Sequence, residues 1–280
     1  MDARLRRFVG VSAALTGILM VLGVYTAATG AGLTCAGRWP FCDGFLGLFP
    51  ANWSSFVEWF HRLVAMVTGF VVLGTTILAW REGADRRIRL ALAGATILLP
   101  SQIILGALTV TTYEWAILLA HFGTASIIFT GVALAAAWAY GPSQSQSSSE
   151  DVNRVLAVAA GLIPVLLALT PHAFVTFGPP IQAAYYLLGL GAYAALLSAA
   201  VWASPSAVSG GPSRRVRLLS AVAAAVVISL LVTGRLVYGG TLQYVSLAGG
   251  LTALALVVAA WYALRRDVGA AGSRGVPGGD

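Results

Sequence analysis

The chain has 280 residues, 58% hydrophobic and only 10% charged, which excludes a water-soluble globular domain and indicates an integral membrane protein. Its formal net charge of +7 results from 17 basic residues, all of them arginines, against 10 acidic residues. Because these arginines are dispersed among the loops instead of clustered on one patch, the composition argues against nucleic acid as a partner.

Eight apolar runs approach the ~20 residues that a membrane-spanning helix needs. The first follows three arginines, as a signal peptide would. It is too long for a signal-peptide core and lacks a convincing cleavage site, so we interpret it as a retained span. The pattern therefore predicts an all-α membrane protein with spans at 8–28, 56–80, 90–111, 116–140, 154–171, 182–203, 217–237 and 241–264.

The distribution of arginine predicts the orientation of these spans. Fourteen of the 17 arginines flank one end of the predicted helices, and the positive-inside rule makes that end cytoplasmic. Both termini are then cytoplasmic. The arginine-only basic set and the alanine-rich spans indicate a prokaryotic plasma membrane.

A polar stretch rich in Ser and Gln at 141–153 divides the chain into two sets of four spans, which predicts a duplicated four-helix unit. The expected parts are an N-terminal half at 1–140, a cytoplasmic linker at 141–153, a C-terminal half at 154–266 and a flexible tail at 267–280.

The first predicted outer loop contains both cysteines of the chain, Cys35 and Cys42. Outside the cytoplasm a disulfide persists, and Gly37 and Pro40 favour the turn that would bring the two thiols together. Two interpretations stay open: a structural staple for the loop, or a redox pair that exchanges electrons.

Two of the three histidines lie at matching depths. His61 and His121 each fall six residues into a predicted span, roughly 8 Å below the same membrane surface. An unpaired imidazole in hydrocarbon is costly, so two at one level should share a ligand. A heme iron held between them is the simplest such ligand.

Glu58 precedes His61 by three residues and therefore shares its helix face. It could orient His61, act as an acid or base on a bound substrate, or be a solvated residue at the helix start. Arg62 should point about 100° away from His61 and either snorkel to the interface or contact a heme propionate. Arg38 and Arg235 are the other outer-side arginines that could pair with propionates.

The second half differs in its chemistry. The position that matches His121 is near Ala248, and the remaining histidine, His172, follows Pro171 at a span end. A lone histidine there is more often an interfacial residue than a ligand. We therefore expect the second half to lack heme ligands.

Gln102, in the third span of the first half, should form an interhelical hydrogen bond.

Taken in order, these elements resemble the heme A synthase family, the CtaA-type membrane proteins. The matching motifs are Gly23-x-x-Thr26-x-x-Thr29-Gly30-x-Gly32, Cys35-x6-Cys42 with Trp39-Pro40 inside it, Glu58-x-x-His61-Arg62, Gln102-x-x-Leu105-Gly106-x-x-Thr109-Val110, and His121.

The resemblance implies an eight-helix oxidoreductase that converts the C8 methyl of heme O into the formyl group of heme A for terminal oxidases. It implies that His61 and His121 hold the substrate heme, that Glu58 is the catalytic carboxylate, and that Cys35 and Cys42 form the redox or structural pair. Heme O synthase and an electron acceptor are the implied partners, and a homo-oligomer is compatible with it. The family usually holds a second heme b in its C-terminal half, which this chain's lack of histidines there puts in question.

Three other readings remain. A non-catalytic bis-histidine cytochrome b that exchanges electrons with quinone would need the histidines but not Glu58. A membrane thiol oxidase would normally need a second cysteine pair, which this chain lacks. A structural assembly factor would need none of this chemistry.

Overall fold

The computed structural model describes every residue except 113, 142–148, 171–173, 204–210, 236–240 and 274–280. Its main helices are α1 (Ala3–Ala28), α2 (Trp53–Arg81), α3 (Arg86–Ile97), α4 (Leu99–Thr111), α5 (Trp115–Tyr140), α6 (Ser149–Ala168), α7 (Pro179–Trp202), α8 (Gly211–Thr233) and α9 (Thr241–Ser273). The connection between α1 and α2 contains three short 3₁₀ turns: η1 (Ala31–Leu33), η2 (Cys35–Gly37) and η3 (Phe45–Gly47).

Eight segments of the described chain are long and apolar enough to span a membrane, which confirms the all-α prediction. The third span consists of two helices, α3 and α4, that are interrupted at Leu98. Pro100 stands in the first turn of α4, where its missing N–H does no harm because that position has no intrahelical acceptor. The sequence pattern predicted one continuous run there, since apolar content does not change at the break.

Several helix ends lie outside the predicted limits. The helix α6 begins at Ser149, inside the predicted linker, and its first turn carries Glu150 and Asp151, which pair with Arg154. The helix α9 continues to Ser273, inside the predicted tail. Hydropathy marks only the apolar part of a helix, whereas acidic residues stabilise a first turn that extends beyond it.

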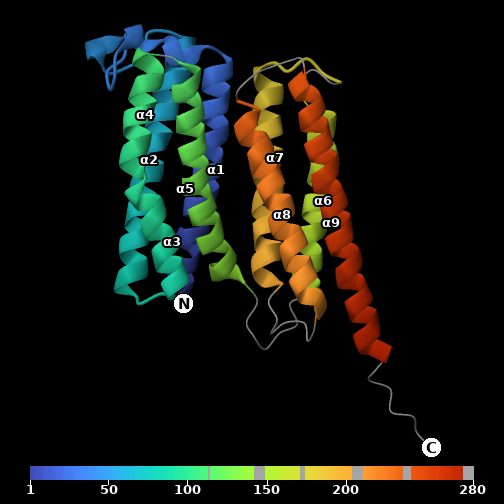
Figure 1. Ribbon diagram of the computed structural model, residues 1–280. Helices are drawn as coiled ribbons and strands as arrows, with labels where there is room; N and C mark the ends of the chain where they lie inside the picture. Colours follow the sequence, from blue (N-terminus) through green and yellow to red (C-terminus); the bar gives the residue numbers. More distant parts are fainter. Residues whose placement is uncertain (113, 142–148, 171–173, 204–210, 236–240, 274–280) are drawn as a thin grey trace, which may run out of the picture.

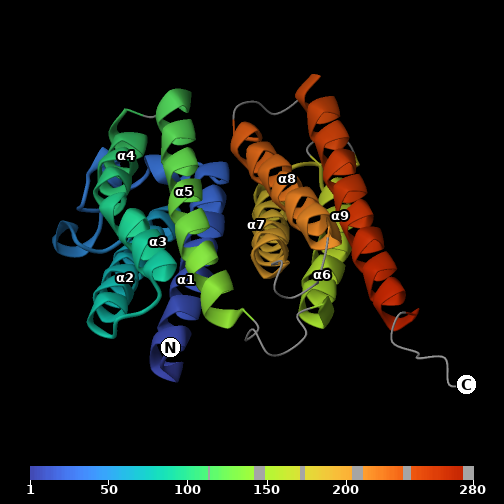
Figure 2. The same cartoon turned by 60° about the horizontal axis from the view of Figure 1, so that its bottom comes forward.

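The chain forms two helical bundles side by side, α1–α5 and α6–α9 (Figures 1 and 2). They meet where α1 and α5 pack against α7. The hydroxyls of Thr130 and Tyr193 lie 2.7 Å apart across this interface, and the indole N–H of Trp202 donates to the Ala137 carbonyl at 2.7 Å. Two hydrogen bonds and close apolar packing therefore join the halves.

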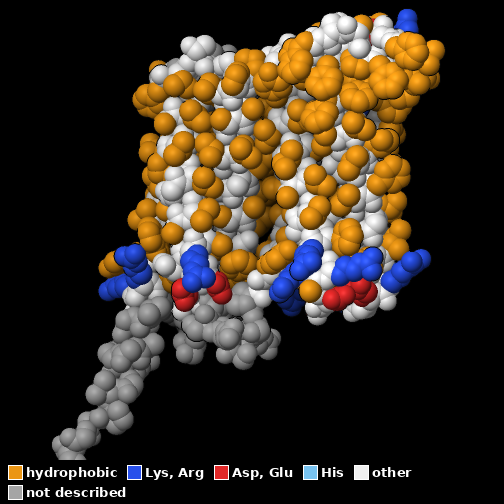
Figure 3. All heavy atoms as spheres, turned by 180° about the vertical axis from the view of Figure 1, so that it is seen from behind, with side chains coloured by type: hydrophobic (Ala, Val, Ile, Leu, Met, Phe, Trp, Pro, Cys, Tyr) orange, Lys and Arg blue, Asp and Glu red, His pale blue; other side chains and the backbone are white. Residues whose placement is uncertain are grey.

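Charged side chains gather at one end of the bundles, and the apolar side of the molecule rises above them (Figure 3). The N-terminus lies at this charged end, and the connection between α1 and α2 lies at the opposite end (Figure 1). The structure thus separates the arginine-rich end from the cysteine loop, as the spans require. The assignment of the arginine-rich end to the cytoplasm remains a prediction.

Candidate functional site

The cysteine loop is closed by a disulfide between Cys35 and Cys42, and both residues are fully buried. The neighbouring carboxylate of Asp43 accepts a hydrogen bond from the Ser55 hydroxyl at 2.6 Å and another from the Ala51 N–H at 2.9 Å. These bonds, that of Ser55 first, hold the pKa of Asp43 below its ordinary value. The loop is therefore bonded to the first turn of α2.

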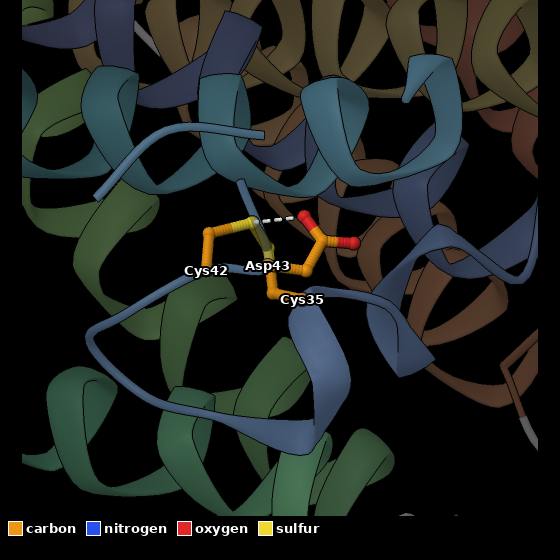
Figure 4. Close-up of side chains that lie close together, drawn as sticks. All are labelled: Cys35, Cys42 and Asp43. Atoms are coloured by element: carbon orange, nitrogen blue, oxygen red, sulfur yellow. Dashed lines mark hydrogen bonds between the residues drawn. A yellow bond between two sulfur atoms is a disulfide. The ribbon is translucent and has the colours of Figure 1, made fainter. Parts of the chain in front are cut away.

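Cys35, Cys42 and Asp43 lie close enough together to suggest a metal site (Figure 4). The sulfur of Cys42 is 3.3 Å from a carboxylate oxygen of Asp43. Because each sulfur is already bonded to the other, neither is a thiolate that could ligate a cation, and neither carries a proton to donate. We interpret this cluster as structural.

Glu58 is buried in α2, with only 4% of its surface exposed. Its carboxylate accepts a hydrogen bond from the Nε of Arg62 at 2.7 Å. The same guanidinium donates through Nη1 to the carbonyls of Arg38 at 3.1 Å and Phe41 at 3.0 Å. Arg62 thus connects the buried carboxylate to the backbone of the cysteine loop.

Two of the readings open at the sequence level are wrong. Glu58 is not a solvated residue at the helix start, because α2 begins at Trp53 and the carboxylate is buried and paired. Arg62 does not snorkel to the surface, because its side chain is only 15% exposed and bonded inward. The sequence contained the signal for this pairing, since Glu and Arg four residues apart on a helix face each other.

His61 projects from α2 toward α1. A Cβ atom placed on Gly23 would lie 3.0 Å from its Cε1 atom. The ring nitrogen Nδ1 is buried and has no hydrogen-bond partner among the described residues. Gly23 therefore provides the space for this imidazole.

His121 projects from α5 toward α4, where its Cε1 would lie 3.5 Å from a Cβ atom on Gly106. Its Nδ1 is also buried without a partner in the described chain. Gln102 donates from Nε2 to the backbone carbonyl of His121 at 3.3 Å, which is the interhelical bond that the sequence predicted.

These two side chains fit the ligand set of a heme iron. Each has a buried Nδ1 without a hydrogen-bond partner among the described residues. Imidazole nitrogen is a common ligand of heme iron, so two buried imidazoles with unsatisfied nitrogens are chemically suited to hold one.

The helices around the histidines do not all pack on one another. In the N-terminal bundle α2 packs on α1 and α3, and α4 packs on α5, but α2 and α4 make no extensive contact in the described chain. The turn η1 contacts both α2 and α4.

The C-terminal bundle is closed instead. Each of its helices packs along two neighbours, in the order α6, α7, α8, α9 and back to α6. A Cβ atom on Gly249 would lie 2.7 Å from the Leu230 side chain, and one on Gly250 would lie 2.5 Å from that of Leu167. No histidine or cysteine occurs among its described residues, and His172 lies outside them.

Tyr186 fills the part of this bundle that faces the N-terminal half. It is fully buried, its hydroxyl donates to the Leu231 carbonyl at 3.0 Å, and its ring meets Phe122 edge-on at 5.2 Å. Phe122 directly follows His121. The described residues of this bundle thus offer no ligands for a second heme b, and the absence of such a heme remains a prediction.

The three outer arginines lie in different surroundings. Arg38 is exposed and offers its carbonyl to Arg62. The guanidinium of Arg235 lies over the Tyr186 ring at 5.8 Å. Arg62 retains a buried Nη2 atom without a partner among the described residues, so one donor of this group is still available.

Comparison with known proteins places these residues in a family context. Residues 51–175 match the model of the COX15-CtaA family, described as cytochrome oxidase assembly protein. This range includes Glu58, His61, Gln102 and His121, but neither cysteine.

Relatives with two different names resemble this chain. A protoheme IX farnesyltransferase of Halobacterium salinarum is 37% identical over 142 residues, which cover 47% of this chain and 29% of that protein. A heme A synthase of Bacillus licheniformis is 34% identical over 119 residues, which cover 41% of this chain and 39% of that protein. A heme A synthase of Bacillus pumilus is 33% identical over 134 residues, which cover 46% of this chain and 43% of that protein. The chain spans less than half the length of each relative.

Proposed function

We propose, from the match of residues 51–175 to the COX15-CtaA family, that the chain is a heme A synthase that oxidises the C8 methyl of heme O to a formyl group. The observation that supports this most directly is the shared position of His61, His121 and a buried Glu58 inside the matched range. Two imidazoles explain heme binding, and the carboxylate adds a reactive group.

His61 and His121 would hold the iron of the substrate heme. The bound heme would supply a redox-active iron. Gly23 leaves room for the His61 ring beside α1, whereas the His121 ring lies at an ordinary contact distance from Gly106.

Glu58 would act on the methyl carbon. Conversion of a methyl to a formyl group takes up one water and releases four protons and four electrons, so a proton acceptor and an electron acceptor are both required. The buried carboxylate could stabilise positive charge that develops at that carbon, or accept its proton. Arg62 positions the carboxylate through Nε, and its free Nη2 donor could contact a propionate.

Arg38 and Arg235 remain candidates for propionate contacts at the outer side. A relative named protoheme IX farnesyltransferase supports heme O, the farnesylated heme, as the substrate, and heme O synthase as the enzyme that supplies it. The electron acceptor would be a further partner, since the described residues of the C-terminal bundle include no histidine that could hold a second heme. The protein would act in the plasma membrane with the cysteine loop on the outer face.

The experiment is heme extraction and mass analysis from cells that make heme O, with and without this protein. Heme A should appear only with the intact protein. Glu58→Gln should bind heme with an unchanged spectrum and form no heme A, while Glu114→Gln, an exposed carboxylate next to α5, should behave as the parent.

Heme that is bound by the parent protein but never modified, although an electron acceptor is present, would contradict the synthase. It would favour the bis-histidine cytochrome that exchanges electrons with quinone, which uses the same histidines but not Glu58. A protein that binds no heme would contradict both.

A further inference from the structure

The connection between α1 and α2 presents a large apolar surface to its surroundings. We call it the outer aromatic surface. Its members are exposed by 48% to 75% each: Phe41, Phe45, Leu46, Leu48, Phe49 and Trp53. A water-facing loop is normally polar, and contiguous apolar patches mark surfaces that bind a protein or a membrane.

The polar groups of the same loop are engaged in hydrogen bonds. The carboxylate of Asp43 is occupied by Ser55 and Ala51, and the carbonyls of Arg38 and Phe41 accept from Arg62. Between residues 39 and 56 Asp43 is the only charged residue, so the exposed side of this segment consists largely of apolar side chains.

The backbone holds the apolar tip outward. The N–H of Cys42 donates to the Gly47 carbonyl at 2.7 Å and that of Gly44 to the Phe49 carbonyl at 2.8 Å, which folds residues 42–49 into a tight reversal. Leu46, at its tip, adopts a left-handed φ of 55° although 75% of it is exposed. Such a conformation is unfavourable for leucine. Contacts within the described chain do not bury this side chain, which points to contact with something outside it.

The surface continues onto the membrane-spanning part of α2. Phe56 stacks on Trp53 with ring centroids 5.4 Å apart and on Phe60 at 5.8 Å. Phe60 is partly exposed on the outside of α2 and directly precedes His61. In Figure 1 the loop extends sideways beyond the ends of α2 and α4, and Figure 3 shows apolar side chains continuing from the helix flanks to this end. A segment that projects sideways at the end of spanning helices lies over lipid.

We propose that the outer aromatic surface is inserted into the interfacial layer of the bilayer, with lipid as its partner. Aromatic side chains favour this layer, because their rings are amphipathic and fit between headgroups and acyl chains. An uncharged aromatic surface continuous with the lipid-facing side of α2 favours lipid over a protein partner. Because Arg62 connects the loop to Glu58, the inserted loop would also hold the outer end of α2. This inference does not depend on the heme chemistry.

The test uses the full-length protein in phosphatidylcholine nanodiscs, which expose both faces to solutes. Leu46→Cys is labelled with the fluorophore NBD, and Glu82→Cys, an exposed residue between α2 and α3, is the control. The native cysteines are buried in the disulfide and should not react, which mass analysis of the labelled protein verifies.

At Leu46 we expect blue-shifted NBD emission, quenching by nitroxide lipids labelled near the headgroup, and protection from iodide. At Glu82 we expect the reverse. A label at Leu46 that matches the one at Glu82 in all three respects would overturn the proposal and favour a protein partner for this surface. The same readout from Phe45→Cys guards against a local effect of one substitution.

Discussion

The Nε atom of Arg62 lies 2.7 Å from a carboxylate oxygen of the buried Glu58, while Nη1 of the same side chain bonds to two carbonyls of the cysteine loop. One cation therefore joins the candidate catalytic carboxylate to a loop that is closed by a disulfide. The loop and the site should respond together when this residue is changed.

Arg62→Met should destabilise the protein strongly, because it leaves Glu58 buried without its cation. Breaking a buried pair by removing one partner costs about 3–5 kcal/mol. The matched control is Arg154→Met, which breaks an exposed pair with Glu150 at the same spacing and should cost less than about 1 kcal/mol. Thermal unfolding in detergent measures both. Equal losses of stability in the two variants would show that the buried Glu58–Arg62 pair contributes no more than the exposed pair.

Gly23→Ala should weaken heme binding, because the new methyl would lie 3.0 Å from Cε1 of His61 and would force the ring to turn. We expect about a tenfold loss of affinity, as is common when the support of a metal ligand is disturbed. Gly106→Ala is the matched control, since its methyl would lie at an ordinary contact distance of 3.5 Å from His121. Heme titration followed by absorbance separates the two, and equal affinities would refute the role of Gly23.

The disulfide should resist reduction in the folded protein, because Cys35 and Cys42 are fully buried. Dithiothreitol followed by alkylation and mass analysis should leave the pair oxidised in the native protein and modify it after denaturation. Cys35→Ser with Cys42→Ser should lower stability by about 2–3 kcal/mol, the chain-entropy value for so short a loop. Rapid reduction of the native protein would instead favour the redox-active interpretation.

Stability at low pH should depend on Asp43. Since hydrogen bonds from Ser55 and Ala51 depress its pKa in the folded state, ionised Asp43 stabilises the protein above the ordinary aspartate value of 3.8. This contribution should disappear as the pH falls below 3.8 and through the lower pKa of the folded state. Asp43→Asn should flatten that acid dependence of thermal unfolding, and Ser55→Ala should reduce it. If Asp43→Asn leaves the acid dependence of thermal unfolding unchanged, ionised Asp43 is not its source.

The purified protein should bind one heme per chain, since among the described residues histidine ligands occur in the N-terminal bundle alone. The heme-to-protein ratio from the pyridine hemochrome assay measures this. The double variant His61→Ala, His121→Ala should abolish heme binding. Tyr186→Phe should keep the heme-to-protein ratio. It should lower the free energy of unfolding by about 1–3 kcal/mol, because the Leu231 carbonyl loses its hydrogen bond from Tyr186. A ratio of two would show that His172 or another group serves a second site.

The amino-acid sequence by itself determined the eight spans and placed Glu58 and His61 on one helix face. Both follow from local rules, because hydropathy adds up along contiguous residues and helical spacing fixes which neighbours share a face. The Glu58–Arg62 pair was within reach of the same rule.

Only the tertiary structure decided that Gly23 and Gly106 adjoin the imidazoles, that Arg62 reaches the carbonyls of the loop, and that Tyr186 and the leucines close the C-terminal bundle. These contacts join residues far apart in the chain. They depend on how each helix is rotated and tilted against its neighbours, which apolar composition leaves undetermined because every face of such a helix is hydrophobic.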